Sequence, residues 1–256
     1  MPIGISTLCT FGKTFQTLGQ YGDIFSPVIE IQDDWKDWVD GKRAKRLLEF
    51  KECHGVEYTV HTPIIDINIA SANDRLRELS IRLVLKSLDH AHRIGARLAV
   101  VHPGARSPLD DYYPNTHWSH NLASLRRISS YAEDLGLDIG IENMSAHTWS
   151  FLQNTDEFKR LFDEGLPVKL TLDIGHAHTH HLVRDFIEKY RNEIAHVHIH
   201  DNMGNVDQHL VVGKGTVDWD WLGKNLSFGS INGIIESVSM NDALASLEKS
   251  RQIFKS

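Results

Sequence analysis

The sequence is poor in the features that assign a chain to a class at a glance. Its 256 residues hold two cysteines, Cys9 and Cys53, which form no CxxC pair. This argues against a cysteine-bound structural zinc and suits a reducing compartment, where we expect both to be inert packing residues. No apolar run approaches the roughly 18 residues of a membrane-spanning helix. The N-terminal MPIGISTLCTFG lacks a basic stretch followed by an apolar one, so we expect no secretory signal and a cytoplasmic location.

Positive charge is also scarce. Lysine and arginine number 27 against 34 aspartates and glutamates, a net charge of −7. The protein as a whole therefore does not attract phosphate backbones, although a local basic groove is compatible with this total. No Pro/Ser-rich linker, low-complexity tract or internal repeat divides the chain. We expect a single domain over residues 1–256, a length close to the roughly 250 residues of a (β/α)8 barrel.

Short β-branched runs alternate with longer amphipathic stretches. The expected strands are Ile3–Ser6, Val28–Ile31, Tyr58–His61, Leu98–His102, Ile139–Glu142, Val168–Asp173, Ala195–His200 and Gly233–Ser237. The expected helices are Lys13–Gly22, Gly41–His54, Asp74–Gly95, Asn121–Gly136, Thr155–Gly165, Leu182–Asn192, Trp219–Asn225 and Asp242–Phe254. An open doubly wound sheet is the competing architecture, but no GxGxxG follows the first strand and polar residues follow most strands. We therefore predict an α/β fold, a single closed (β/α)8 TIM barrel.

Histidine, by contrast, is abundant. Seven of the 16 histidines fall between His176 and His200, and histidine is the commonest metal ligand. Nine metal-binding side chains lie at or soon after the expected strand ends: His61, His102, Glu142, Asp173, His176, His198, Asp207, His209 and Glu236. Because the C-terminal ends of barrel strands converge on one face, we expect the nine to meet there in one metal site.

Three of the nine are carboxylates that end apolar strands. Glu142 follows DIGI, Asp173 follows LTL and Glu236 follows GII. A carboxylate buried there without a partner costs several kcal/mol, so each needs a cation. A salt bridge to a helix lysine or arginine is the alternative, but no strand carries a matching set of cations. With His198 the three form an O3N donor set, which suits zinc, manganese, magnesium or cobalt.

The remaining histidines leave choices open. His61 and His102 each precede proline, which fixes an extended or turn conformation at the strand exit, yet either alone also fits a packed core histidine. The three histidines of HVHIH share one face of their strand, so the sequence alone does not say which binds an ion. Asp207 and His209 fit a surface loop as well as a ligand pair. The GKG at Gly213–Gly215 predicts either a phosphate- or carboxylate-binding turn or a simple loop.

Taken in order, HTP, HPG, IEN, LDIGH, HxH, DxH, GKG and IIES resemble the xylose-isomerase-like TIM-barrel superfamily. This superfamily includes sugar isomerases and epimerases as well as endonuclease IV, and the resemblance covers nearly the whole chain. In the isomerase and epimerase branch it implies one divalent ion, held by Glu142, Asp173, His198 and Glu236. In endonuclease IV it implies three zinc ions, held by that quartet together with His61, His102, His176, Asp207 and His209.

The surroundings of these residues depart from endonuclease IV. That enzyme has a tyrosine directly after the proline of its HxP motif, where this chain has Ile64. It also has a basic and aromatic loop after the second strand, where this chain has Gln32-Asp33-Asp34-Trp35. Two carboxylates in that loop are the wrong charge for phosphate contact. The departures weigh against recognition of abasic sites.

Two functions follow from the resemblance. The first is a metal-dependent isomerase or epimerase of a sugar or sugar phosphate, acting through a metal-stabilised enediolate. Glu142 and Glu236 would act as base and acid, His176 would orient a hydroxyl, and Trp35 or Trp38 would close over the sugar. The alternative is zinc-dependent cleavage of DNA at abasic sites by two or three ions. A barrel that only binds a sugar is a third possibility, but simple binding does not require paired glutamates at a metal.

Overall fold

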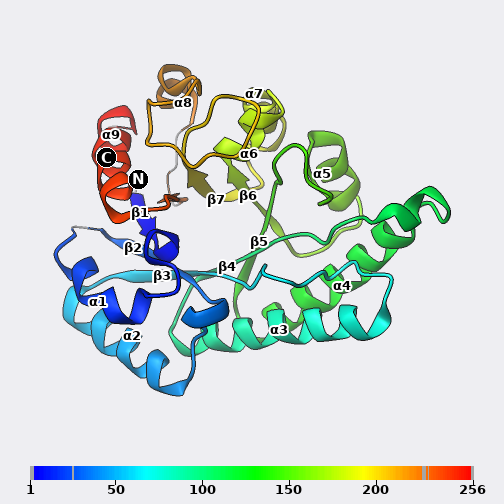
Figure 1. Ribbon diagram of the computed structural model, residues 1–256, viewed down its shortest axis with the longest axis horizontal. Helices are drawn as coiled ribbons and strands as arrows, with labels where there is room; N and C mark the ends of the chain where they lie inside the picture. Colours follow the sequence, from blue (N-terminus) through cyan, green and yellow to red (C-terminus); the bar gives the residue numbers. More distant parts are fainter. Residues whose placement is uncertain (1–2, 25, 227–228, 230, 255–256) are drawn as a thin grey trace.

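Eight parallel strands close into one barrel in the computed structural model, which describes residues 3–24, 26–226, 229 and 231–254 (Figure 1). Each strand pairs with its neighbours in chain order, and β8 pairs with β1. The strands are β1 Ile3–Ser6, β2 Val28–Gln32, β3 Glu57–His61, β4 Leu98–Val101, β5 Asp138–Glu142, β6 Lys169–Asp173, β7 Ile194–Ile199 and β8 Asn232–Ile235. The predicted TIM barrel is confirmed.

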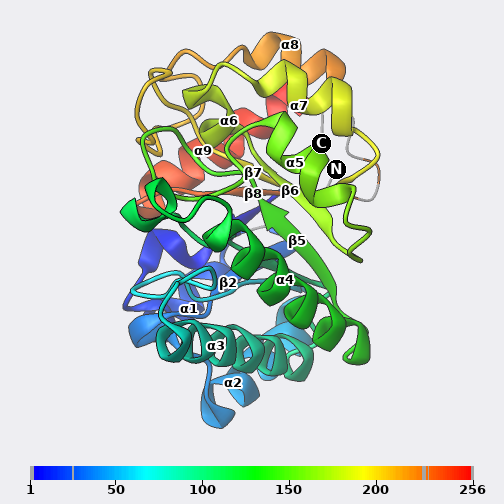
Figure 2. The same cartoon turned by 90° about the vertical axis from the view of Figure 1, so that its right-hand side faces the viewer.

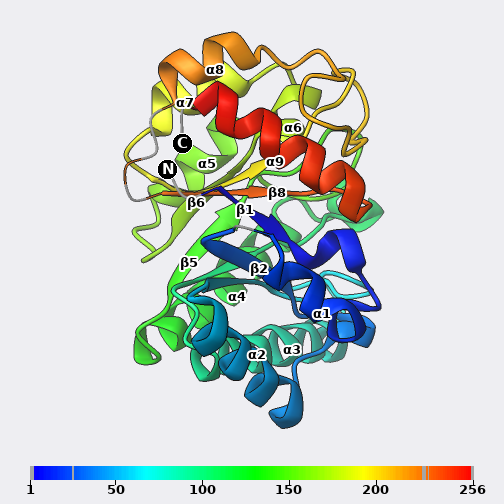
Figure 3. The ribbon, with the colours of Figure 1, turned by 90° about the vertical axis from the view of Figure 1, so that its left-hand side faces the viewer.

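Helices cover the barrel on the outside (Figures 2 and 3). They are α1 Thr14–Gly22, α2 Gly41–His54, α3 Asp74–Arg93, α4 Thr116–Asp134, α5 Thr155–Phe162, α6 Ile174–Thr179, α7 Val183–Tyr190, α8 Trp219–Asn225 and α9 Met240–Phe254, with 3-10 turns η1 Thr7–Thr10, η2 Trp35–Asp37 and η3 Pro108–Asp111. Capping side chains fix the N-termini of several helices. Asp40 accepts hydrogen bonds from the backbone N–H groups of Lys42 and Arg43 at the start of α2, and Asn73 caps α3 in the same way. Among the described residues, no helix is long and apolar enough to cross a membrane.

The largest differences from the predicted helices lie in two places. Helix α4 begins at Thr116, five residues before the predicted Asn121, after Asn115 in the left-handed region at φ 67°. Its first turn buries His117 and Trp118, which carry no aliphatic periodicity that a sequence pattern could detect. Helix α6 starts directly after β6, where no helix was predicted. This short helix is important because it carries His176.

The cysteine prediction is half right. Cys9 is buried, and its Sγ lies 3.2 Å from the hydroxyl oxygen of Tyr21. Cys53 lies on the exposed face of α2, so it is not a packing residue. A chain with no CxxC pattern offers no local signal that separates a buried cysteine from an exposed one.

Candidate metal centre

The nine candidate residues come together at the C-terminal ends of the strands. His61, Glu142 and Asp173 are the last residues of β3, β5 and β6, and His198 is the fifth of the six residues in β7. The others lie just beyond strand ends, in the following loops or in α6: His102, His176, Asp207, His209 and Glu236. A cavity of about 240 Å³ opens among them. Its walls are formed by Leu8, Gln32, His61, Ile64, His102, Glu142, Met144, Ser145, His176, Asp207, His209 and Glu236.

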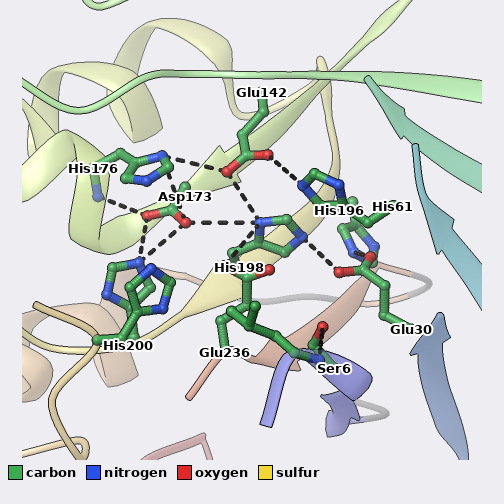
Figure 4. Close-up of polar contacts among 12 residues, drawn as sticks. Ser6, Glu30, His61, Glu142, Asp173, His176, His196, His198, His200 and Glu236 are labelled. Carbon is green, nitrogen blue, oxygen red and sulfur yellow. Dashed lines mark hydrogen bonds and ion pairs between the residues drawn. The ribbon is translucent and has the colours of Figure 1, made fainter. Parts of the chain in front are cut away.

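The centre of the cluster is a quartet of buried donors, Glu142, Asp173, His198 and Glu236, whose ligand atoms lie within 4.8 Å of one another (Figure 4). Nδ1 of His198 faces all three carboxylates, at 3.2 Å from Glu142 Oε1 and 3.7 Å from both Asp173 Oδ2 and Glu236 Oε2. Within the described part of the chain, every ion-pair partner of these carboxylates is a histidine. The alternative of salt bridges to lysine or arginine is therefore wrong. Three carboxylates converging on one nitrogen fit a divalent cation.

Glu142 has the most contacts with histidines. Its Oε2 lies 3.3 Å from Nε2 of His61 and 2.9 Å from Nε2 of His102. Its Oε1 lies 3.3 Å from Nδ1 of His176 and 3.2 Å from Nδ1 of His198. Because Nδ1 of His61 donates to the carbonyl of Thr62, Nε2 is the nitrogen that His61 presents to the cavity. His61, His102 and Glu142 thus form a second group that could hold an ion.

A third group lies on the other side of Asp173. It consists of His176, His200, Asp207 and His209. The His176 Nδ1 donates to the carbonyl of Asn143, and its Nε2 lies 3.1 Å from Asp207 Oδ2. The rings of His200 and His209 stack with centroids 4.0 Å apart. A Cβ on Gly175 would lie 2.0 Å from Cε1 of His200, so the LDIGH turn needs its glycine to admit that ring.

Unpartnered buried atoms support an ion in this third group. Nδ1 of His200, Oδ1 of Asp207 and Nδ1 of His209 are buried and have no hydrogen-bond partner in the described structure. Such atoms are rare in native proteins and call for an ion or water as a partner. The donor set has three nitrogens and a carboxylate, which suits zinc. The residues present therefore fit a divalent metal here as well as at the quartet.

Charge and burial compete in the metal-free cluster. Burial raises the pKa of Glu142, but the charges of His102 and His198 outweigh it and hold that pKa well below its usual range. Burial alone would lower the pKa of His61, yet Glu142 raises it to about 9. Burial also lowers the pKa of His102, and there burial prevails. Because ligating imidazoles must be neutral, an ion that binds here releases protons.

Three members of the cluster are not among the nine predicted residues: Glu30, His196 and His200. Glu30 is fully buried in β2, where its Oε2 accepts a hydrogen bond from Nε2 of His196 at 2.9 Å. Burial raises the pKa of Glu30, but His198 and His196 outweigh it and hold that pKa well below its usual range. A glutamate in the middle of the apolar run VIEIQ was the available signal. The strand position of the three histidines of HVHIH left the choice among them open. In the structure His196 contacts Glu30, His198 contacts Glu30 and the quartet carboxylates, and His200 contacts Asp173.

The structure does not place the tryptophans of the loop after β2 at the cavity, where one of them was expected to close over a sugar. Trp35 is 57% exposed and packs near Phe11, while Trp38 lies edge-on against His90, so neither tryptophan lines the cavity. Leu8, Ile64 and Met144 form the apolar wall instead. The carboxylates of Asp33 and Asp34, which the sequence offered as an argument against phosphate contact, have internal partners: Val39 N–H and His90 for Asp33, and the N–H groups of Trp35, Ile64 and Ile65 for Asp34.

The GKG turn is a structural loop. The N–H groups of Gly213 and Val217 donate to the buried carboxylate of Asp201, as does the indole N–H of Trp219. A Cβ on Gly215 would lie 2.2 Å from the carbonyl oxygen of Asn202, so only glycine fits this close approach of the two backbone segments. The N–H groups of Gly213, Lys214, Thr216 and Val217 already have partners within the chain, which favours the simple-loop alternative.

Fold, strand-end site and donor set together define a class of barrel with a cluster of side chains that could hold a metal ion. The chain belongs to the xylose isomerase-like TIM barrel family, whose model matches residues 25–255. It is 32% identical over 259 residues to an uncharacterised protein of Methanocaldococcus jannaschii, covering 100% of both chains. A solved D-tagatose 3-epimerase-like protein has a TM-score of 0.92 and 28% identity, covering 100% of this chain and 97% of the other. A probable endonuclease 4 of Aquifex aeolicus is 23% identical over 83% of this chain and 81% of its own length.

Proposed function

We propose that the protein is a divalent-metal-dependent isomerase or epimerase of a sugar or sugar phosphate. The observation that carries the proposal is the placement of Glu142 and Glu236, two buried carboxylates from different strands that line one small cavity beside His198. The likeness to the D-tagatose 3-epimerase-like protein supports it, since it extends over the whole chain. A pair of carboxylates that line one cavity is an arrangement suited to proton removal and return at one carbon.

Each side chain then has a distinct task. Glu142, Asp173, His198 and Glu236 would hold the ion, zinc or manganese by this donor set, with magnesium or cobalt as alternatives. When bound, the ion supplies Lewis-acid polarisation of neighbouring carbonyl and hydroxyl oxygens. Glu142 and Glu236 would take and return the proton at the reacting carbon. His176, fixed by the Asn143 carbonyl, would orient a hydroxyl, and the apolar wall of Leu8, Ile64 and Met144 would limit access of water.

Solvent-deuterium exchange tests this proposal. The wild-type protein, loaded with zinc or manganese and given ketose and ketose-phosphate substrates in D2O, should incorporate deuterium at the epimerised carbon. The Glu142→Gln and Glu236→Gln variants should each lose this exchange. Asp37→Asn is the matched control, because Asp37 is equally buried but binds the N–H groups of Gly12 and Thr14 outside the cavity. Retained exchange in either glutamate variant would remove that glutamate from proton transfer.

Cleavage of DNA at abasic sites is the second candidate. The extra groups around His61 and His209 favour it, because they could hold additional ions, and so does the relative named probable endonuclease 4. Against it, none of the described residues that line the cavity is lysine or arginine, whereas a phosphodiester backbone needs cations. About three ions per chain by plasma mass spectrometry, with metal-dependent nicking of an abasic duplex, would favour this candidate. About one ion and no nicking would favour the isomerase.

A further inference from the structure

Glu30 lies behind the quartet and outside the walls of the cavity. It is the third residue of β2 and is fully buried. Its Oε2 accepts hydrogen bonds from Nε2 of His196 at 2.9 Å and from Oγ1 of Thr59 at 3.1 Å. Its other oxygen, Oε1, lies 3.1 Å from Nε2 of His198, the contact drawn as a dashed line in Figure 4. The carboxylate of Glu30 therefore contacts His198 at the nitrogen that faces away from the three quartet carboxylates.

The contact between Glu30 and His198 is close but incomplete. Its geometry falls short of a hydrogen bond, and in the described structure neither Oε1 of Glu30 nor Nε2 of His198 has another hydrogen-bond partner. Both residues are fully buried, away from bulk solvent. A small rotation of the imidazole ring would let these two atoms, which face each other at 3.1 Å, form a hydrogen bond. Hydrogen bonds of this kind often shorten when a site is occupied.

The two nitrogens of His198 consequently have opposite surroundings. Nε2 faces the carboxylate of Glu30, which can only accept a proton, whereas Nδ1 faces Glu142, Asp173 and Glu236. A neutral imidazole carries one N–H group and one lone pair. The N–H group belongs on Nε2, where Glu30 accepts it, and the lone pair of Nδ1 then points at the three carboxylates.

We propose that Glu30 is a positioning residue, which fixes the tautomer and ring orientation of His198 so that Nδ1 is the nitrogen that binds the ion. The inference rests on the ion of the proposed function but not on the substrate or the reaction. Carboxylates that hold a ligating histidine in this way change metal affinity by about 10- to 100-fold when they are removed. Sequence spacing does not reveal the pair, because Glu30 and His198 lie on strands far apart in the chain.

Metal titration of Glu30→Gln tests the proposal. A glutamine offers one acceptor oxygen and one NH2 group, so it cannot accept from both His196 and His198. We expect the dissociation constant for Zn²⁺, measured by competition with a chromophoric chelator, to rise about 10- to 100-fold for the binding step that His198→Gln abolishes. Thr59→Val is the matched control: it removes a donor to Oε2 of Glu30 but leaves Oε1 and His198 untouched, so its affinity should match the wild type.

A tautomer measurement gives a readout that a purely structural role would not change. With ¹⁵N-labelled histidine rings and the His198 signals assigned from their absence in His198→Gln, wild-type protein with Zn²⁺ should show a protonated Nε2 and a metal-bound Nδ1. This measurement needs no Glu30 variant, so it can be made even if Glu30→Gln fails to fold.

A metal-bound Nε2, an unchanged affinity in Glu30→Gln, or an equal loss in Thr59→Val would each overturn the role of Glu30. A wild-type protein that binds no ion would overturn the proposed function as well, whereas one that binds Zn²⁺ but turns over no sugar would leave the role of Glu30 intact.

Discussion

Glu142 and Glu236 reach the same cavity, yet their surroundings differ. The Glu142 side consists of Glu142 with His61, His102 and His176, and all three imidazoles lie within 3.3 Å of its carboxylate. Glu236 faces the same nitrogen of His198 as Glu142 does, and its contact with Nδ1 at 3.7 Å is its single ion-pair contact in the described structure. Both carboxylates are almost fully buried. The two carboxylates therefore differ in the number of histidine contacts that each would have to give up in order to move.

This contrast suggests a division of labour within the quartet. A carboxylate surrounded by imidazoles is fixed in place and strongly acidic, which suits a metal ligand. A carboxylate with few contacts is free to approach a substrate carbon and exchange a proton with it. We therefore expect Glu142 to contribute more to ion binding and Glu236 to contribute more to proton transfer. The following experiments would break or sharpen this comparison.

Removal of the divalent ion should have the largest effect. We expect protein treated with a strong chelator and dialysed to lose all turnover, because the ion would neutralise the carboxylates of the quartet and polarise the substrate. Addition of Zn²⁺ or Mn²⁺ should restore turnover, and plasma mass spectrometry should show the ion returning in proportion. Full turnover by protein that contains no ion would contradict both roles.

The two glutamate variants test the comparison directly. Glu236→Gln should lower kcat by about 10²- to 10⁴-fold, the usual size of a general acid–base contribution, with a moderate loss of ion affinity. Glu142→Gln should lower affinity more, because its carboxylate contacts four histidines. Chelator competition and steady-state kinetics on both variants measure the two quantities. Equal losses of affinity would mean that the crowding around Glu142 has no functional meaning.

The histidines should make the metal-free protein sensitive to pH. Burial lowers the pKa of His61, but Glu142 outweighs burial and raises that pKa to about 9. Asp207 likewise outweighs burial at His209 and raises its pKa to about 9. A pKa raised in the folded state stabilises the protein fully below the unfolded value of about 6.5, and this stabilisation is lost as the pH rises through about 9. The free energy of unfolding, measured by urea denaturation after chelation, should therefore fall over this interval. His61→Gln should flatten the fall, and a rise would show that these ion pairs are absent.

The third group offers a smaller test. His209→Gln removes a donor that belongs to the third group and not to the quartet. If the isomerase proposal holds, the variant should keep the quartet ion and lose less than about tenfold in kcat/KM, equivalent to about 1.4 kcal/mol. Ion content and kinetics measured on the same preparation provide the check. A loss of several orders of magnitude would instead favour chemistry that uses several ions.

The apolar wall should give the smallest effect. Ile64 lines the cavity and is 41% exposed. Ile64→Ala removes part of a contact that binds substrate and transition state alike, so we expect KM to rise by about fivefold, or roughly 1 kcal/mol, with kcat nearly unchanged. A large fall in kcat would mean that the wall also positions one of the two glutamates.

The alternation of strands and helices was readable from the sequence because it depends on local patterns. Apolar runs and glycine stops lie within a few residues of one another, so the eight strands were placed within a few residues of their actual ends. The start of α4 was wrong because its first turn buries His117 and Trp118, residues without a helical apolar pattern. The extent of the domain over residues 1–256 stays a prediction.

The sequence by itself determined the barrel and the nine strand-end donors, since chain order and the geometry of parallel strands bring such ends to one face. Only the tertiary structure decided what each donor contacts. It placed Glu30 of β2 against His196 and His198 of β7, joined His200 to Asp173, and left Glu236 with few partners while Glu142 gained four. These contacts join residues that are distant along the chain and depend on the closure of the barrel and the directions of the side chains. No local pattern of residues encodes them.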